Sequence, residues 1–142
     1  MVLLLLFGCF LVATALPPDS ADLTVTISDI EYPAAGRLVV MLYSSAEGFP
    51  REPELAAYRI TLSLSDAATQ THTFTDVVPA IYAVAVFQDH NDNGEIDTNF
   101  LGIPKEPIGA YNMKGLGKPS FKKSQLEIPA GSSSVALQLL NQ

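Results

Sequence analysis

Oxygen-bearing side chains recur at every second position from residue 89 to residue 93, in a stretch that reads Asp-His-Asn-Asp-Asn-Gly-Glu-Ile-Asp up to residue 97. The spacing matches the first nine positions of an EF-hand loop, in which oxygens at positions one, three, five and nine are directed at a calcium ion. Gly94 stands at position six, where such a loop turns sharply. The stretch therefore predicts a cation-binding loop, with calcium as the leading candidate. The predicted ligands are the side chains of Asp89, Asn91, Asn93 and Asp97 and the backbone carbonyl of Glu95.

This ligand set is incomplete by comparison with an EF-hand. Position twelve, which normally carries a bidentate glutamate, is Phe100. Water, or a carboxylate from elsewhere such as Glu106, would have to complete the coordination shell. With two carboxylates among the predicted ligands, we expect a dissociation constant on the order of 10⁻⁴ to 10⁻³ M, as in extracellular calcium modules.

A metal-free interpretation of the same residues stays open. Asp89, Asn91 and Asn93 can form Asx turns, in which the side-chain oxygen accepts a hydrogen bond from a nearby backbone N–H. The Asn93-Gly94 pair would then reverse the chain without any ion. Magnesium is a further alternative to calcium. Zinc is not expected, because His90 has no Cys or His partner at ligand spacing.

The elements that must position this loop are strands. Apolar residues recur with period two in several stretches, which is the pattern of a half-buried strand, and other stretches are apolar on both faces, as in a central strand. The alternating stretches are 23–28, 60–65 and 135–139, the fully apolar ones are 38–43 and 81–87, and weaker strands are expected at 71–75 and 121–128. About seven short strands separated by turn residues predict an all-β fold: a two-sheet antiparallel sandwich, immunoglobulin-like or transthyretin-like.

One long connection interrupts this pattern. Residues 88–119 are rich in Pro and Gly and show no sustained alternation, so we expect a long loop with the Asp and Asn residues at its entrance. An ordered loop of this length needs an interaction that offsets its conformational entropy, and a bound cation would supply one. A short helix is expected around residues 52–58, after Pro50.

The other candidate functional residues give weaker signals. Lys105 and Tyr111 lie in the long loop and could serve a carbohydrate-binding or small-ligand site, which is the alternative function. An unrecognised hydrolase using Asp92, Glu95 and Asp97 is less favoured, because these carboxylates are close together in sequence. Catalytic motifs such as Gly-x-Ser-x-Gly and His-Glu-x-x-His are missing from the sequence, so we do not expect an enzyme.

Composition limits the partners and the compartment. A net charge of −7 and a pI near 4.6 argue against nucleic acid, and Lys118, Lys122 and Lys123 are expected to form a solvated strand face. Residues 1–15 resemble a signal peptide that is too short to span a membrane, with one domain following from residue 16 to residue 142. A lipid-anchored form through Cys9 is a less favoured alternative, because Phe7 is bulky for a lipoprotein cleavage site. We therefore expect export to the periplasm or the exterior.

Several motifs together resemble a known family. They are Tyr82-Ala-Val-Ala-Val86, the Asp89 to Asp97 stretch, Gly102-Ile-Pro-Lys-Glu-Pro107, Gly109 and Gly117-x-Pro-Ser-Phe121. This succession resembles the bacterial secreted family catalogued as domain of unknown function 2141, over about residues 22 to 140. The resemblance implies export and a β-sandwich and carries no activity. The combined expectation is an exported, non-enzymatic module that binds an unknown protein or glycan partner.

Overall fold

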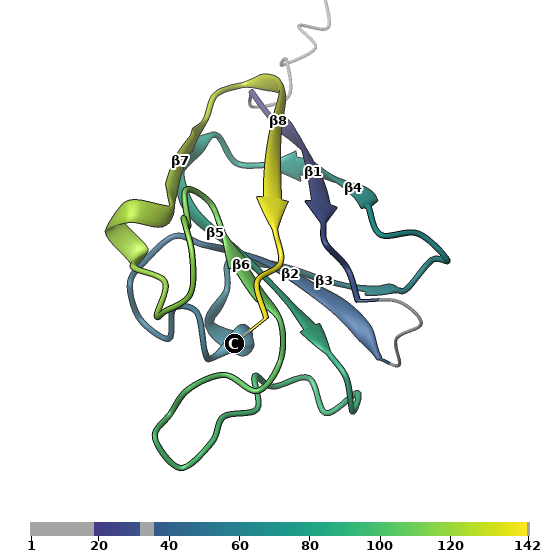
Figure 1. The fold of residues 1–142 in the computed structure, drawn as a ribbon. Helices are drawn as coiled ribbons and strands as arrows, with labels where there is room; N and C mark the ends of the chain where they lie inside the picture. Colours follow the sequence, from purple (N-terminus) through teal and green to yellow (C-terminus); the bar gives the residue numbers. More distant parts are fainter. Residues whose placement is uncertain (1–18, 32–35, 142) are drawn as a thin grey trace, which may run out of the picture.

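Two β-sheets pack face to face in the computed structural model, which describes residues 19–31 and 36–141 (Figure 1). The three-stranded sheet has the order β4 (Gln70–Val77), β1 (Ala21–Ser28) and β8 (Gly131–Gln138). The five-stranded sheet has the order β3 (Tyr58–Ser63), β2 (Arg37–Tyr43), β5 (Ala80–Asp89) and β6 (Ile108–Ala110), with β7 (Gln125–Ile128) also paired to β5. The predicted all-β sandwich is confirmed.

Strand β1 illustrates how the period-two pattern builds the core between the sheets. Its Leu23, Val25 and Ile27 are fully buried, while the threonines between them lie on the outer face. Thr24 and Thr26 form side-chain hydrogen bonds of 2.9 and 3.2 Å with threonines of β4. Alternation in the sequence is therefore converted directly into one buried and one solvated face.

One strand pair departs from the antiparallel arrangement that we expected. β1 pairs antiparallel with β4 but parallel with β8, in a register that begins with Ala21 opposite Gly131. The chain crosses from the five-stranded sheet to the three-stranded sheet between β7 and β8. It reaches the three-stranded sheet at the end where β1 begins, so β8 runs beside β1 in the same direction. No tight hairpin joins β1 and β8, so their relative direction is not constrained by a turn.

Both faces of the five-stranded sheet are buried at its centre. Tyr82, Val84 and Val86 of β5 belong to the core between the sheets, whereas Ala83, Ala85 and Phe87 belong to a second core on the opposite face. This second core is covered by connecting segments and not by a third sheet. The side chains packed against it are those of Phe49, Ala56, Ile96, Met113 and Phe121. The loops are thus a third packed layer, which explains why β2 and β5 are apolar throughout.

The long connection contains structure that the sequence pattern did not predict. Ile108–Ala110 forms the short strand β6, which pairs with β5 and exchanges two backbone hydrogen bonds with Leu140, of 3.2 and 3.0 Å. A glycine is required at the centre of β6, because a Cβ on Gly109 would lie 2.3 Å from the backbone oxygen of Gln138. β6 therefore links the five-stranded sheet to the chain that follows β8.

The two short helical segments are 3₁₀ turns. Segment η1 (Pro53–Leu55) lies within the helix expected at 52–58. Segment η2 (Phe121–Ser124) occupies the first half of the strand expected at 121–128, so that β7 starts only at Gln125. Lys122 and Lys123 accordingly lie on a 3₁₀ turn and not on the strand face that we expected.

Two sequence predictions concern residues outside the described part of the chain. The expected signal peptide at residues 1–15 and the alternative lipid attachment at Cys9 both precede residue 19, where the description begins. Among the helices of residues 19–31 and 36–141, none has the length and apolar character needed to cross a membrane.

Candidate functional site

The loop from Asp89 to Asp97 begins where β5 ends. Asp89 is the last residue of β5 and is 2% exposed, so its carboxylate lies beneath the loop and not in solvent. Its two oxygens accept hydrogen bonds from the backbone N–H groups of Asn93 at 3.2 Å and Gly94 at 2.7 Å. The chain turns through positive φ angles of 61° at Asp92 and 78° at Gly94, which brings these N–H groups back toward the strand end. Asp89 thereby organises the whole turn.

The structure brings three of the predicted ligand side chains, those of Asn91, Asn93 and Asp97, into contact in this loop, while Asp89 contacts the backbone of the same turn. Asp97 accepts hydrogen bonds from the amide nitrogens of Asn91 at 2.6 Å and Asn93 at 3.1 Å. The amide oxygens point the other way: that of Asn91 accepts from the Asn93 backbone at 3.2 Å, and that of Asn93 accepts from the Glu95 backbone at 2.8 Å. These contacts correspond to the metal-free network of Asx turns.

The donor set of this loop also fits a hard cation. The predicted side-chain ligands are two carboxylates and two amide groups within one turn, and oxygen donors of this kind suit calcium or magnesium. Because each amide carries an oxygen and an NH₂ group, a half-turn of the Asn91 and Asn93 amides would direct oxygens toward Asp97. Each rotation would break one hydrogen bond to the backbone and one to the Asp97 carboxylate. In the part of the chain that the structure describes, no group of three or more His, Cys, Asp or Glu side chains is arranged to hold a metal.

A second buried carboxylate closes the base of the loop. Glu106 is 2% exposed, and its two oxygens accept hydrogen bonds from the backbone N–H of His90 at 2.8 Å and of Asp97 at 3.0 Å. The adjacent Lys105 N–H donates to the Asp97 carbonyl at 2.8 Å. The sequence suggested Glu106 as a cation ligand from outside the turn. Glu106 lies between Pro104 and Pro107, which have no backbone N–H. Its carboxylate therefore accepts hydrogen bonds from backbone N–H groups of other segments, and these two prolines were the sign in the sequence.

Residues beside the strand end hold this loop on the sheet. Gln88 is fully buried, and its amide group exchanges hydrogen bonds with the backbone of Glu31, at 3.0 and 3.3 Å. The imidazole of His90 lies 3.2 Å from the Glu31 carboxylate. Gly36 packs so closely that a Cβ there would lie 1.8 Å from the backbone oxygen of Asp89.

Charged residues surround the loop from the neighbouring strands. Asp92 points away from the other acids and forms an ion pair of 3.0 Å with Arg37 of β2. Arg59 of β3 donates to the carbonyl of Gly94 at 3.3 Å. Cationic side chains therefore occupy part of the loop's outer surface, where they reduce its attraction for a metal ion.

Beyond the acidic turn, the chain from residue 98 to residue 107 projects from one end of the sandwich (Figure 1). Its tip is held by Asn99, whose side-chain oxygen accepts hydrogen bonds from the backbone N–H groups of Leu101 at 2.9 Å and Ile103 at 3.1 Å. Arg51, from the segment that precedes η1, donates to the carbonyl of Gly102 at 2.6 Å. The tip is thus fixed while its apolar side chains stay exposed.

A groove of about 460 Å³ lies beside this tip, between three connecting segments. The residues that line it are mainly apolar, and they are Pro50, Arg51, Ile96, Leu101, Gly102, Ile103, Pro104, Ile108, Leu116, Gly117, Lys118 and Pro119. A second hollow of about 430 Å³ adjoins it and shares the lining from Leu116 to Pro119. Sequence reasoning missed both sites. The groove is formed by segments that are distant in the chain, and the second hollow, although residues 112–124 alone form it, depends on how that stretch folds back on itself.

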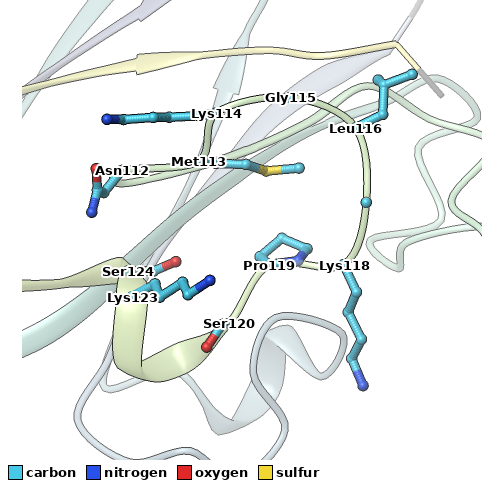
Figure 2. Close-up of a pocket in the computed structure, with 11 residues that line it drawn as sticks. Asn112, Met113, Lys114, Gly115, Leu116, Lys118, Pro119, Ser120, Lys123 and Ser124 are labelled. Carbon is cyan, nitrogen blue, oxygen red and sulfur yellow. The ribbon is translucent and has the colours of Figure 1, made fainter.

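Figure 2 shows the second hollow, which is framed by the loop from Asn112 to Ser120 and by η2. The side chains of Met113 and Lys123 extend into it, while Lys118 extends away from it. The two residues that sequence reasoning proposed for a ligand site, Lys105 and Tyr111, line neither hollow. Tyr111 is half-buried and packs against the core between the sheets.

Comparison with known proteins gave one match. The model of a protein family described as "Uncharacterized protein conserved in bacteria (DUF2141)" matches residues 25–136. The resemblance inferred from the sequence motifs is therefore confirmed over most of the described chain. No curated protein and no solved structure matched this chain.

Proposed function

The chain belongs to this bacterial family, DUF2141, and from that premise we propose that it is an exported, non-enzymatic β-sandwich module. Its binding face is the end of the sandwich formed by the projecting loop and the groove beside it. The module acts in the periplasm or outside the cell, where the expected signal peptide would direct it. Binding, and not catalysis, is its function.

The exposure of large apolar side chains around the groove carries this proposal. Phe100 is 95% exposed, and Leu101 and Leu116 are each 68% exposed. Phe100 and Leu101 lie on a loop whose backbone is held by specific hydrogen bonds, so their exposure does not result from a poorly packed segment. Contiguous exposed apolar side chains beside a groove are typical of interaction sites.

The positions of the titratable groups support a non-enzymatic function. His72 packs edge-on against the ring of Phe74, with 5.2 Å between ring centroids, and His90 lies beside Glu31. Neither histidine lines the groove. Asp97, a candidate acid for the hydrolase alternative, has both oxygens engaged by asparagine amides. A general acid or base must lie within hydrogen-bond reach of a bound substrate, and these histidines lie away from the groove.

We further propose that the Asp89 to Asp97 turn binds calcium weakly and is stabilised by it. The side chains of Asn91, Asn93 and Asp97 already lie in contact, and Asp89 binds the backbone of the same turn, so the ion would require amide rotation and little backbone movement. Rotation would break two hydrogen bonds to the backbone and two to the Asp97 carboxylate, at about 0.5–1.5 kcal/mol for each neutral bond and more for the charged ones, which is the reason to expect weak binding. Calcium would act on the stability of the loop that carries the binding face.

Site-specific photo-crosslinking tests the binding face. A benzophenone amino acid replaces Leu101 in one variant and Val78 in another, and each purified protein is irradiated with an extract of a bacterial cell envelope. Val78 is a matched control because it is 62% exposed and does not line the groove. We expect discrete adducts, identified by mass spectrometry, at position 101 only. Equal labelling at both positions, or none at position 101, would contradict the proposal.

A further inference from the structure

The apolar groove has a charge that is opposite to that of the molecule. Its lining contains two cationic side chains, Arg51 and Lys118, and no acidic residue. The whole chain carries 15 acidic and 8 basic residues, so a lining without a carboxylate departs from the composition of the protein. Neither Arg51 nor Lys118 forms a salt bridge with any of the described residues. Both charges are therefore free to meet a ligand.

The surroundings of the groove strengthen its positive charge. The adjoining hollow is lined by Lys114 and Lys123 in addition to Lys118 (Figure 2). Residues 98–126 contain five lysines and one acid, Glu106. Because Glu106 is buried and is bound by two backbone N–H groups, it presents no exposed negative charge to this surface. The lysine-rich side of the groove can therefore attract an anion, while the acids that flank the lining residues, Glu52, Glu95 and Asp97, lie outside the lining itself.

We infer that the groove binds a single-chain anionic amphiphile, of which a long-chain carboxylate is the chemical class. This inference rests on the proposed function and names the ligand of the same binding face. The alkyl chain would lie against Leu101, Ile103 and Leu116, and the carboxylate would meet Arg51 and Lys118. One guanidinium nitrogen of Arg51 is bound to the carbonyl of Gly102, but the group has five N–H donors and keeps others for a carboxylate.

The size of the groove agrees with this ligand class. Its volume of about 460 Å³ lies within the range of roughly 300–1,000 Å³ that is typical of small-molecule sites. The lining combines many apolar contacts with two polar groups that orient the ligand, which is the usual composition of such a site. Burial of the alkyl chain supplies affinity, while the two cations select an anionic head group.

Titration with dodecanoate, kept below its micelle concentration and followed by isothermal calorimetry, tests the inference. We expect saturable binding by the purified protein. Dodecyltrimethylammonium has the same chain and the opposite charge, and acetate has the charge without the chain, so neither should bind measurably. The cationic amphiphile is a stringent control, because the net charge of −7 would favour it if binding were nonspecific.

Matched variants locate the site. Lys118→Glu and Leu116→Asp alter the lining at exposed positions, and each should weaken dodecanoate binding at least about tenfold through charge repulsion. Lys122→Glu and Val78→Asp make the same chemical changes outside the groove and should leave the affinity within about twofold. Equal weakening by the control variants, or equal binding of the cationic amphiphile, would overturn the inference.

The two experiments distinguish a wrong ligand class from a wrong binding face. If position 101 gives discrete crosslinked adducts but dodecanoate does not bind, the binding face stands and the carboxylate is rejected. If neither crosslinking nor titration gives a signal, both proposals are rejected.

Discussion

The carboxylate of Glu106 accepts a hydrogen bond of 3.0 Å from the backbone N–H of Asp97, and this contact joins two parts of the long connection. Its second oxygen accepts from the backbone of His90, at the start of the acidic turn. A single buried carboxylate therefore holds both ends of the turn while the turn's own side chains hold its centre. The loop has a stable framework before any cation is considered.

Replacement of Glu106 by glutamine should weaken this framework. Glutamine keeps one acceptor oxygen but places an NH₂ group against a second backbone N–H, so one buried donor loses its partner. A hydrogen bond to a charged group contributes about 1.5–3 kcal/mol, and we expect Glu106→Gln to lower the free energy of unfolding by a similar amount. Urea denaturation, followed by circular dichroism, measures the change.

The matched control for this variant is Glu127→Gln, which makes the same substitution at an exposed position of β7. It should change the free energy of unfolding by less than about 0.5 kcal/mol. If both variants have the same stability as the wild type, Glu106 does not support the loop.

Substitution of Gly36 by alanine should disturb the contact between the start of β2 and the end of β5. Gly36 has a φ angle of 97°, and a Cβ there would overlap the Asp89 carbonyl. Gly115 also has a positive φ angle, of 120°, but nothing lies within 4 Å of its Cβ position. Gly115→Ala should therefore cost only the backbone strain of about 1–3 kcal/mol, and Gly36→Ala distinctly more. Thermal unfolding measures the stability of both variants. If Gly36→Ala and Gly115→Ala lose the same stability, a small backbone shift relieves the overlap at residue 36.

The strands were largely predictable from sequence because their burial is a local pattern. Period-two alternation identified β1, and the fully apolar stretches identified β2 and β5. Two features were not predictable. Strand β6 has only three residues and exists because β5 and Leu140 offer partners, and the parallel pairing of β8 depends on where the chain crosses between the sheets.

Of the two candidate sites, the acidic turn was predictable from sequence and the groove was not. The residues of the acidic turn are close in sequence, so their spacing predicted their proximity. The groove is lined by Arg51, Leu101 and Lys118, which come from three separate connections and share no motif. Sequence showed the apolar and basic residues but not that they meet, since that depends on how the loops pack over the second core.

Calcium should raise the unfolding temperature if the acidic turn binds it. At a free concentration ten times the dissociation constant, binding would add about 1.4 kcal/mol to the free energy of unfolding. Differential scanning fluorimetry in calcium chloride against a chelator, at matched ionic strength, measures this shift. Asp97→Asn should abolish the shift. Asp92→Asn is the control in the same turn, because the Asp92 side chain pairs with Arg37, and it should retain the shift. An absence of any calcium effect on the wild type would exclude the ion as a stabiliser.

High pH should destabilise the protein through Tyr43. This side chain is fully buried beneath the loops and donates a hydrogen bond of 3.4 Å to the sulfur of Met41. Burial, with a smaller contribution from nearby Glu54, raises the pKa of the Tyr43 phenol above its ordinary value of 10.0. As the pH rises above 10, the unfolded chain loses this proton while the folded protein keeps it, so the free energy of unfolding falls. The contribution of Tyr43 is complete below pH 10 and decreases by about 1.4 kcal/mol per pH unit above it.

Urea denaturation between pH 9 and pH 11.5 measures this dependence. Tyr43→Phe should show a smaller loss of stability above pH 10 than the wild type, although its stability at pH 7 is lower because the bond to Met41 is absent. Burial, together with Tyr58, also raises the pKa of Tyr82, so a residual slope should remain in Tyr43→Phe and should decrease further when Tyr82→Phe is added. Identical slopes for the wild type and Tyr43→Phe would mean that the Tyr43 phenol ionises equally readily in the folded and unfolded chains, which would contradict its burial beneath the loops.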